Sequence, residues 1–293
     1  MNRFLIFRTD RIGDFLISAI LIKCIKDNDP MAHISVVASN KNYSYIKTFP
    51  YINQVIQLNN NIFSKIYVFF NLFKFNYKSI IVHDNKNRSK FITFFLRSKN
   101  KIKISNTKTE SQIKLIKDIL KKIKFNFINN SLNILTHRSI NKDKNENLIQ
   151  LHFDEKWIFN DYIKKFVNIE PTELELANFL KKIIKNKNKE LIITTGFNLP
   201  NKIKNIETIL KKLKIKLYKN MDFLELEKIT SKSNILISCH GAISHVAAAN
   251  NIKQIDIIDK SYDYFKWSDH FRNYNFLYRD NFDKLSEKII DLI

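Results

Sequence analysis

One carboxylate near the start of the chain stands where it could act as a general base. The run Arg8-Thr9-Asp10-Arg11-Ile12-Gly13-Asp14 joins a short apolar segment to an apolar helix. In parallel α/β sheets, ligands bind at the carboxyl ends of strands, where such turns lie. Asp14 is expected at the helix N-terminus, which stabilises an ionised carboxylate, and a carboxylate so placed is a candidate base. The alternative, which stays open, is a capping residue only.

Two neighbours of Asp14 belong to the same candidate site. Gly13 is expected to let the backbone turn without strain from a Cβ atom. Arg11 is a candidate for pairing with a phosphate or carboxylate of a substrate. The alternative for Arg11 is an ordinary charge at the surface.

A second strand, small-residue turn and helix are expected within residues 235–249. Small residues leave backbone N–H groups open, and the following helix adds the positive end of its dipole, so the turn suits a diphosphate. Imidazole N–H groups can donate to phosphate oxygens. The alternative is a buried turn whose histidines bind backbone groups. The candidate residues are His240, Gly241, Ala242, Ser244 and His245.

A third candidate turn follows the strand expected at 191–195. Hydroxyl, glycine and lysine groups bind phosphate, although the spacing of a P-loop is absent. The candidates here are Thr194, Thr195, Gly196, Lys202 and Lys204.

The elements that must position these residues alternate between strand and helix, which predicts mostly parallel sheets covered on both faces. We expect two domains, residues 1–165 and 166–293, with 126–171 forming the end of the first domain and a linker. The last helix, 281–292, is a candidate for packing back toward the first domain. The expected strands lie at 3–7, 33–38, 54–58, 79–83, 101–104, 191–195, 214–218, 234–238 and 254–258.

Composition narrows the class of protein. The formal net charge is +22, which favours polyanionic partners, although a Lys-, Asn- and Ile-rich composition with few Gly and Pro also fits a biased genome. The lysines are spread along the chain, so no nucleic-acid partner is expected. Two distant cysteines indicate a reducing cytoplasm, and no apolar run is long enough for a membrane span. Segments 62–75 and 109–125 are amphipathic, and are candidates for contact with anionic lipid or for core packing.

With these residues in place, the chain resembles glycosyltransferase family 9, the bacterial heptosyltransferase family of lipopolysaccharide core synthesis. The run from Arg8 to Asp14 is similar to the family's opening signature. Residues 30–38 and 50–56 match its P-x-A-x-I-x-V-V-A and P-x-I-x-x-V-I patterns. Residues 237–249 align without gaps on its I-S-x-D-T-G-x-x-H-x-A-A-A signature.

The resemblance implies an α/β GT-B fold, in which two Rossmann-like doubly wound domains face a central cleft. It implies an N-terminal domain for the acceptor and a C-terminal domain for the nucleotide-sugar donor, ADP-heptose or another. The reaction implied is inverting transfer, without a bound metal or cofactor, to lipopolysaccharide or another lipid-linked surface glycan. Asp14 takes the role of base, His245 contacts the donor diphosphate, and Thr194, Thr195 and Lys202 or Lys204 are the nearest matches to further phosphate contacts. A lipid-linked acceptor also implies peripheral contact with the inner face of the cytoplasmic membrane.

One departure leaves a second function open. The family's D-T-G is here His240-Gly241-Ala242, so an acid is replaced by a histidine and a hydroxyl is lost. The backbone N–H groups survive, so diphosphate binding is still expected, but specificity for heptose is not implied. Because fold alone does not establish activity, a catalytically inactive nucleotide-binding or assembly protein on the same fold is the alternative.

Overall fold

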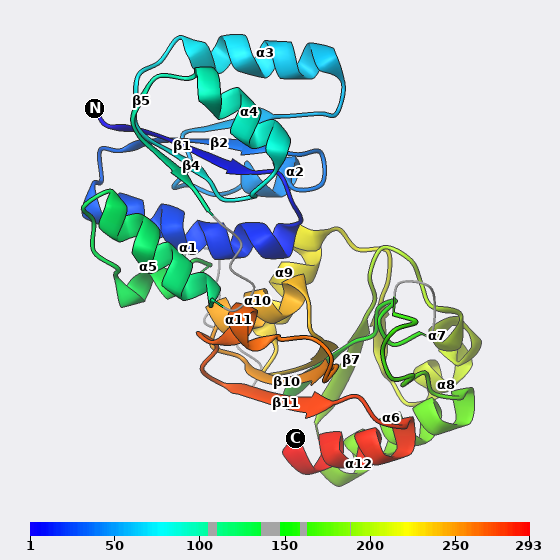
Figure 1. Cartoon of the computed structure of the whole chain (residues 1–293). Coiled ribbons are helices and arrows are strands. Elements are labelled where there is room, and N and C mark those ends of the chain that lie inside the picture. Colours follow the sequence, from blue (N-terminus) through cyan, green and yellow to red (C-terminus); the bar gives the residue numbers. More distant parts are fainter. Residues whose placement is uncertain (105–109, 136–146, 159–162, 188) are drawn as a thin grey trace. The chain divides into compact units, whose positions relative to one another are not determined.

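The computed structural model describes residues 1–104, 110–135, 147–158, 163–187 and 189–293. It divides into two compact units, each with its own parallel sheet (Figure 1). Unit 1 comprises Met1–Ile134 and Phe265–Asp269, and unit 2 comprises Leu135–Tyr264 and His270–Ile293. The expectation of two Rossmann-like α/β units is therefore confirmed.

Unit 1 has five strands in the order β3-β2-β1-β4-β5. Helices α1 (Ile12–Asn28) and α5 (Gln112–Lys122) cover one face, and α3 (Ile62–Phe73) and α4 (Asn87–Phe95) cover the other (Figure 1). Unit 1 also contains α2 (Tyr43–Ile46) and a 3-10 turn at Asn129–Leu132. The strands are β1 (Arg3–Arg8), β2 (His33–Ala38), β3 (Gln54–Gln57), β4 (Tyr77–Val82) and β5 (Ser98–Lys103).

The centre of unit 1 is built from β1 and α1. All four apolar residues at 4–7 are fully buried, as a strand in the middle of a covered parallel sheet requires. Helix α1 buries ten side chains between Phe15 and Ile25, because its sequence is apolar on almost every face. The chain order reverses between β1 and β4, and the crevice at such a reversal is where α/β sheets bind ligands.

Unit 2 has six strands in the order β11-β10-β9-β6-β7-β8, and here the order reverses between β6 and β9. Its strands are β6 (Leu148–His152), β7 (Glu190–Thr194), β8 (Lys216–Tyr218), β9 (Ile235–Cys239), β10 (Lys253–Ile258) and β11 (Tyr274–Tyr278). Its helices are α6 (Glu173–Lys187), α7 (Asn201–Asn205), α8 (Glu207–Lys212), α9 (Phe223–Lys232), α10 (Ala242–Ala249) and α12 (Phe282–Leu292). The short helix α11 (Phe265–Ser268) belongs to unit 1.

The division between the units differs from the expected boundary at 165/166. Strand β6 lies in the second sheet, paired with β7 and β9, and all five of its residues are buried. The polar residues Gln150 and His152 interrupt the apolar pattern of this strand. Both side chains are hydrogen-bonded to the Thr194 hydroxyl, and Gln150 also accepts from the hydroxyl of Ser233. The Lys- and Asn-rich residues 138–146, within the segment expected to end the first domain and form a linker, lie outside the described part of the chain.

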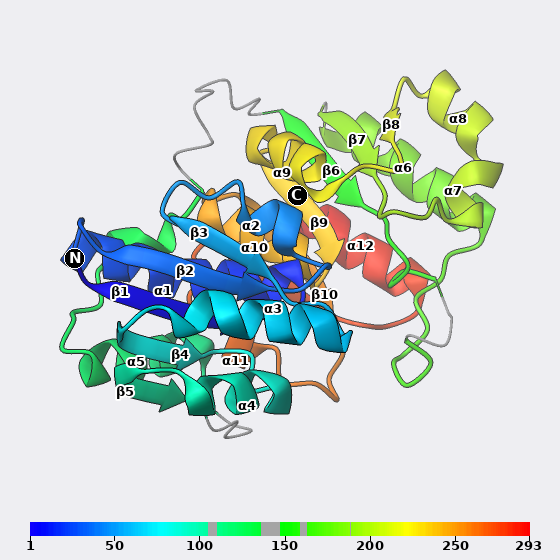
Figure 2. The same cartoon turned by 90° about the horizontal axis from the view of Figure 1, so that it is seen from above.

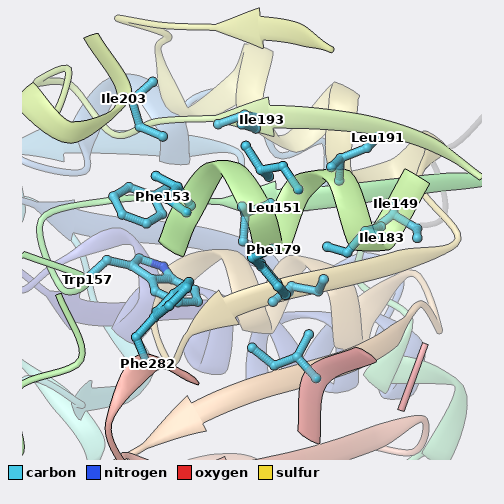
Figure 3. Packing of buried hydrophobic residues seen from close by; sticks show 14 of the residues in the cluster. Ile149, Leu151, Phe153, Trp157, Phe179, Ile183, Leu191, Ile193, Ile203 and Phe282 are labelled. Atoms are coloured by element: carbon cyan, nitrogen blue, oxygen red, sulfur yellow. The ribbon is translucent and has the colours of Figure 1, made fainter. Parts of the chain in front are cut away.

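The core of unit 2 also places the last helix. Phe282, Leu285 and Ile289 of α12 join the cluster formed by α6 and the strands (Figure 3), and Phe282 packs edge-on against Phe179. Helix α12 therefore belongs to unit 2 and packs on its core. Its apolar residues recur at three- and four-residue spacing, which suits one buried face.

Element ends differ from expectation by a few residues in most cases. The helix expected at 204–213 is divided into α7 and α8. Strand β11, at the edge of the second sheet, was not expected, because its Tyr- and Phe-rich sequence follows a turn-rich stretch. The two orientations in Figures 1 and 2 show the helices of each unit on both faces of its sheet.

Candidate functional site

A hollow of about 1220 Å³ opens in unit 1 at the carboxyl ends of its strands. It is lined by segments that follow β1, β2, β3 and β4, so it lies at the reversal of strand order where ligands are expected. The charged residues in its lining are Asp10, Arg11, Asp14, Lys41, Lys86 and Arg88.

Asp14 lies in this hollow, half-buried, in the first turn of α1. Its Oδ2 accepts a hydrogen bond of 3.2 Å from the backbone N–H of Arg11. This is the only hydrogen bond that the described residues make to the carboxylate, so Asp14 caps the helix and keeps acceptor capacity for a ligand. The capping and ligand-binding interpretations of Asp14 are thus compatible.

Gly13 does not act as expected. It is the second residue of α1, and none of the three glycines, all within the described chain, has positive φ. The turn from β1 into α1 therefore does not need the conformational freedom of glycine. Arg11, which precedes the helix, is exposed and lines the hollow, as its candidate role requires.

A second carboxylate, Asp10, shares the hollow and was not singled out from the sequence. It forms ion pairs with Lys86 at 2.9 Å and with Arg8 at 3.3 Å. Burial raises the pKa of Asp10, and the charges of these two cations offset this only in part. Asp10 is therefore held by protein cations, in contrast to Asp14.

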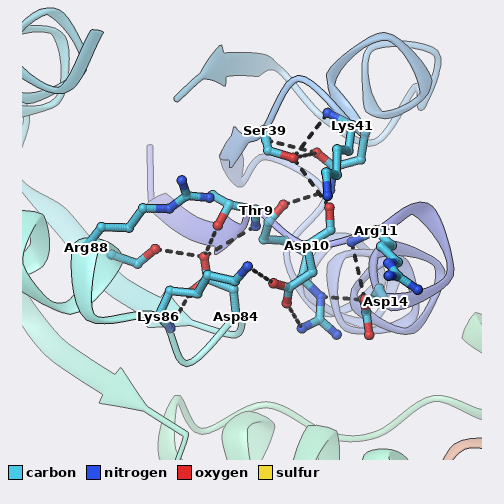
Figure 4. Close-up of polar contacts among 12 residues, drawn as sticks. Thr9, Asp10, Arg11, Asp14, Ser39, Lys41, Asp84, Lys86 and Arg88 are labelled. Carbon is cyan, nitrogen blue, oxygen red and sulfur yellow. Dashed lines mark hydrogen bonds and ion pairs between the residues drawn. The ribbon is translucent and has the colours of Figure 1, made fainter. Parts of the chain in front are cut away.

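Asp84, just after β4, links the turn after β4 to the turn after the neighbouring strand β1 through hydrogen bonds (Figure 4). Its Oδ2 accepts from the hydroxyls of Thr9 at 2.6 Å and Ser89 at 2.7 Å. Its Oδ1 accepts from the backbone N–H of Lys86 at 3.2 Å. This network fixes the turn after β1 against the turn after β4, and so sets the positions of Asp10 and Lys86.

Arg8 turns inward rather than into the hollow. It is 4% exposed, and it donates to the carbonyl oxygens of His83 and Asp14. Its contact with the carbonyl of Asp14 anchors the first turn of α1 from beneath. Burial, with a smaller effect of the Arg8 charge, holds the pKa of His83 well below its ordinary value, so this imidazole is neutral.

In unit 2, the turn between β9 and α10 lies at the other reversal of strand order. Several of its N–H groups are used within the protein: that of His240 binds the Ile257 carbonyl, and that of Gly241 binds Ser244 Oγ. Among the described residues, no partner is seen for the N–H groups of Ala242 and Ile243. The expectation of an open turn is thus met at the first two residues of the helix, whose dipole favours an anion there.

His240 is held by a buried carboxylate on the neighbouring strand β10. Its Nδ1 lies 2.8 Å from Oδ2 of Asp256, which is fully buried. The hydroxyls of Ser238 and Ser244 both lie 2.8 Å from the other oxygen, Oδ1. Because a carboxylate is an acceptor, Nδ1 of His240 carries the proton and Nε2 remains for another partner. Asp256 was not foreseen from the sequence.

Lys156, in the turn after β6, brings a cation to the same place. A Cβ atom added at Gly241 would overlap the Nζ atom of Lys156. The ammonium also binds Asp154 at 2.9 Å and the carbonyl of Cys239 at 3.5 Å. Burial acts to lower the pKa of Lys156, but the charge of Asp154 outweighs it, so the pKa is raised and the ammonium stays charged. The Asp-Glu-Lys run after the apolar segment 148–152 was the signal that sequence reasoning passed over.

His245 lies within an aromatic cluster on α10 and the segments that face it. Its ring centroid is 5.8 Å from that of His240 and 5.2 Å from that of Phe271. Tyr264 packs on His240 at 5.0 Å, and burial raises the pKa of Tyr264 to about 12. The structure therefore brings His240, Gly241, Ala242, Ser244 and His245 together, as the sequence predicted.

The turn after β7 is less suited to a ligand than its composition indicates. Thr194 and Thr195 are fully buried, and the Thr194 hydroxyl lies 2.9 Å from Gln150 Nε2. Lys202 lies 3.7 Å from Glu170, and Lys204 is exposed. In the sheet, β6 stands between β7 and β9, so Lys156 is closer in strand order to the turn between β9 and α10 than Gly196 and its neighbours are.

Within the described residues, no group of three or more His, Cys, Asp or Glu side chains has the arrangement of a metal site. None of the helices found there has the length and apolar character that crossing a bilayer demands.

Comparison with known proteins gives a fold but no sequence match. No family model and no curated protein matches this sequence. Among solved structures, Escherichia coli heptosyltransferase WaaC with ADP has a TM-score of 0.75 at 12% identity, with 99% of this chain and 100% of that chain covered. A glycosyl transferase family 9 structure from Veillonella parvula has a TM-score of 0.69 at 12% identity, covering 100% of this chain and 90% of that one.

The same fold also occurs with a different activity. UDP-GlcNAc 2-epimerase from Methanocaldococcus jannaschii has a TM-score of 0.59 at 12% identity, with 100% of this chain and 91% of that chain covered. The chain therefore has the two-unit α/β fold of these proteins over its full length, and the choice of activity depends on the residues of its sites.

Proposed function

We propose that this protein is an inverting glycosyltransferase of the heptosyltransferase type. It would move heptose or a related sugar from ADP-heptose or another nucleotide sugar to lipopolysaccharide or another lipid-linked glycan. The observation that carries the proposal is that each sheet places suitable chemistry at its reversal of strand order: carboxylates in unit 1, and cations with a helix N-terminus in unit 2. Two substrates, an acceptor to be deprotonated and a diphosphate to be held, match these two sites.

Unit 2 is assigned to the nucleotide-sugar donor. Lys156 and the N–H groups at the start of α10 supply donors for a diphosphate. The Nε2 of His240 adds a further donor when the ring carries a proton on both nitrogens. In transfer the leaving nucleotide gains negative charge, and fixed cations and dipoles stabilise it in the transition state. In this proposal these groups meet that charge, without a metal. The ADP in the WaaC structure agrees with such a ligand class.

Unit 1 is assigned to the acceptor, with Asp14 as general base. An attacking hydroxyl must lose its proton, and a positioned base typically contributes 10²–10⁴-fold to the rate. Asp14 suits this task better than Asp10, because Asp10 is paired with Lys86 and Arg8. Arg11 and Lys41 in the same hollow can pair with acidic groups of the acceptor.

The base assignment is tested by replacing Asp14 with Asn. We expect transfer to fall by at least about 10²-fold, while affinity for the donor nucleotide stays unchanged because unit 2 is intact. Asp118→Asn, an exposed carboxylate on α5, is the matched control and should keep full activity. A near wild-type rate for Asp14→Asn removes Asp14 from the mechanism.

The donor is found by a thermal-shift screen of nucleotide sugars, since a ligand that binds only the folded protein raises its melting temperature. Product analysis then separates the functions on this fold. Transfer to an acceptor supports the proposal. A nucleotide sugar whose sugar has been epimerised, with the nucleotide unchanged, indicates an epimerase. Nucleotide binding without any turnover indicates a catalytically inactive binding protein, the alternative suggested by His240-Gly241-Ala242.

A lipid-linked acceptor requires the protein to work at a membrane surface. We therefore propose a cytoplasmic protein in peripheral contact with the inner face of the cytoplasmic membrane. The positive net charge of the chain supports contact with anionic lipid.

A further inference from the structure

Two neighbouring helices of unit 1 present large apolar side chains to solvent. On α3, Ile62, Phe63, Tyr67 and Phe70 are each more than 60% exposed, and so are Phe91 and Phe94 on α4. We call these six residues the α3–α4 face. Helix α3 buries only Val68 and Leu72 fully. Clustered exposed apolar residues of this kind mark an interaction site, and not the core packing that was the alternative for segment 62–75.

The other amphipathic segment behaves differently. In α5 the residues Ile113, Ile116, Ile119 and Leu120 are buried, and the helix packs on α1. Segment 109–125, apart from Thr109, which lies outside the described residues, thus follows its core-packing alternative. The comparison shows that exposure on α3 is not the general property of helices in this unit.

An apolar groove of about 640 Å³ runs between α3 and α4. Ile66 and Phe69 line it from α3, and Phe91 and Phe95 line it from α4. The rings of Phe69 and Phe95 meet edge-on with centroids 6.0 Å apart, so the two helices form one continuous apolar surface. A surface of this size and character can take up hydrocarbon.

The charge around the α3–α4 face is of one sign. Residues 54–103 contain ten Lys and Arg and a single acid, Asp84. Asp84 is buried and hydrogen-bonded to Thr9 and Ser89, so it presents no negative charge at the surface. Lys65 on α3 and Lys74, the residue that follows α3, are exposed.

Two further cations lie directly against the aromatic side chains or their backbone. The Arg97 guanidinium lies 5.6 Å from the ring centroid of Phe73. The Lys101 ammonium donates to the carbonyl of Phe94 at 3.0 Å. Aromatic rings bordered by Lys and Arg are typical of surfaces that lie in the headgroup region of anionic membranes, where the cations are attracted to the lipid phosphates.

We propose that the α3–α4 face docks on an anionic phospholipid bilayer, with its aromatic side chains at the boundary between headgroups and acyl chains. The groove takes up hydrocarbon, and the surrounding cations pair with lipid phosphates. This extends the proposed function by naming the surface that meets the membrane. Asn87 and Arg88 line both the groove and the hollow that holds Asp14, so docking brings that hollow to the lipid surface.

The test is co-sedimentation of the full chain with vesicles of phosphatidylcholine, either alone or with about 30 mol% phosphatidylglycerol as the anionic lipid. Neither donor nor acceptor is present, so the outcome is independent of transferase activity. We expect binding to the anionic vesicles and at least tenfold weaker binding to neutral ones. The triple variant Phe63→Ser/Phe70→Ser/Phe94→Ser should bind anionic vesicles at least tenfold more weakly than wild type.

The matched control is Leu174→Ser/Phe276→Ser, two exposed apolar residues of unit 2, which should bind as wild type does. All five substituted side chains are exposed, and an unchanged melting temperature verifies that each variant folds. Wild-type binding by the triple variant overturns the proposal. A second result also overturns it: wild type is a dimer by light scattering, the triple variant is a monomer, and neither protein binds vesicles. The α3–α4 face would then join two copies of the chain.

Activity separates this proposal from the proposed function. If both hold, the triple variant keeps its rate on a water-soluble acceptor fragment and loses rate on the same acceptor embedded in vesicles. Vesicle binding without transfer by wild type supports docking and counts against the transferase. Transfer without vesicle binding does the reverse.

Discussion

At the scale of single residues, the candidate site in unit 2 depends on the buried carboxylate of Asp256. Asp256 lies sixteen positions after His240 but binds its Nδ1, because β10 runs beside β9 in the sheet. Ser238 and Ser244 complete its hydrogen bonds. His240, which departs from the family signature, therefore has a defined tautomer and orientation, set by a fully buried carboxylate.

Asp256→Asn is expected to weaken nucleotide binding through His240. An amide cannot accept from three donors as the carboxylate does, and a buried donor left unpaired costs about 1–3 kcal/mol. Titration calorimetry with ADP on the single variants His240→Ala and Asp256→Asn and on the double variant isolates the coupling. We expect the double variant to bind no more weakly than His240→Ala. Losses that simply add show that Asp256 acts without His240.

At the scale of elements, the turn between β9 and α10 requires glycine for space rather than for conformation. Gly241 has φ of −175°, an extended backbone that any residue adopts. A Cβ atom there would overlap the Lys156 ammonium. The glycine thus lets a cation from the β6 turn approach the start of α10.

Gly241→Ala is expected to displace the Lys156 ammonium and weaken ADP binding by about tenfold, the loss of one charge-assisted hydrogen bond. The melting temperature should change little, since the backbone conformation is tolerated and a lysine end is flexible. Gly196→Ala is the matched control in the β7 turn, where the nearest atom, Glu155 Oε2, is 3.3 Å away. If Gly196→Ala weakens binding as much, the diphosphate contacts the β7 turn, as the sequence predicted.

Most elements could be predicted from the sequence, because apolar runs such as 33–38 and 235–239 are bounded by clear turns. Strand β6 could not be assigned to the second sheet from the sequence, because its polar residues Gln150 and His152 find their partners in Thr194 and Ser233, far along the chain. For the same reason the sequence located His240 and Asp14 but missed Lys156 and Asp256. A motif identifies residues that are close in the sequence, whereas the order of strands in the sheet determines which distant turns lie next to one another.

At the scale of the whole molecule, each unit buries a neutral histidine, and this makes stability depend on pH. Burial lowers the pKa of His152 in unit 2 to about 4 and that of His83 in unit 1 well below its ordinary value. An unfolded histidine has a pKa of about 6.5. Stabilisation from these neutral rings is therefore complete above about pH 6.5, and is lost as the pH falls toward their folded-state pKa values.

His152→Gln should reduce this acid sensitivity. The His152 shift corresponds to about 3 kcal/mol of unfolding free energy lost between roughly pH 6.5 and 4. Gln cannot take up the proton. The measurement is urea unfolding followed by circular dichroism at about pH 7.0, above this pH window, and at about pH 4.5, near its lower end. We expect a smaller drop in the midpoint for the variant, and equal drops show that His152 is already solvated in the native state.

The ion pair between Lys156 and Asp154 has a kinetic consequence for turnover. Its ammonium is shared with a buried carboxylate before any ligand arrives. A diphosphate bound at the start of α10 must compete with Asp154 for the ammonium. The nucleotide product is therefore bound more weakly than it would be by a lysine without an ion pair. Under the proposed function, departure of the product is fast, and the residence time of ADP should lengthen when Asp154 is made neutral.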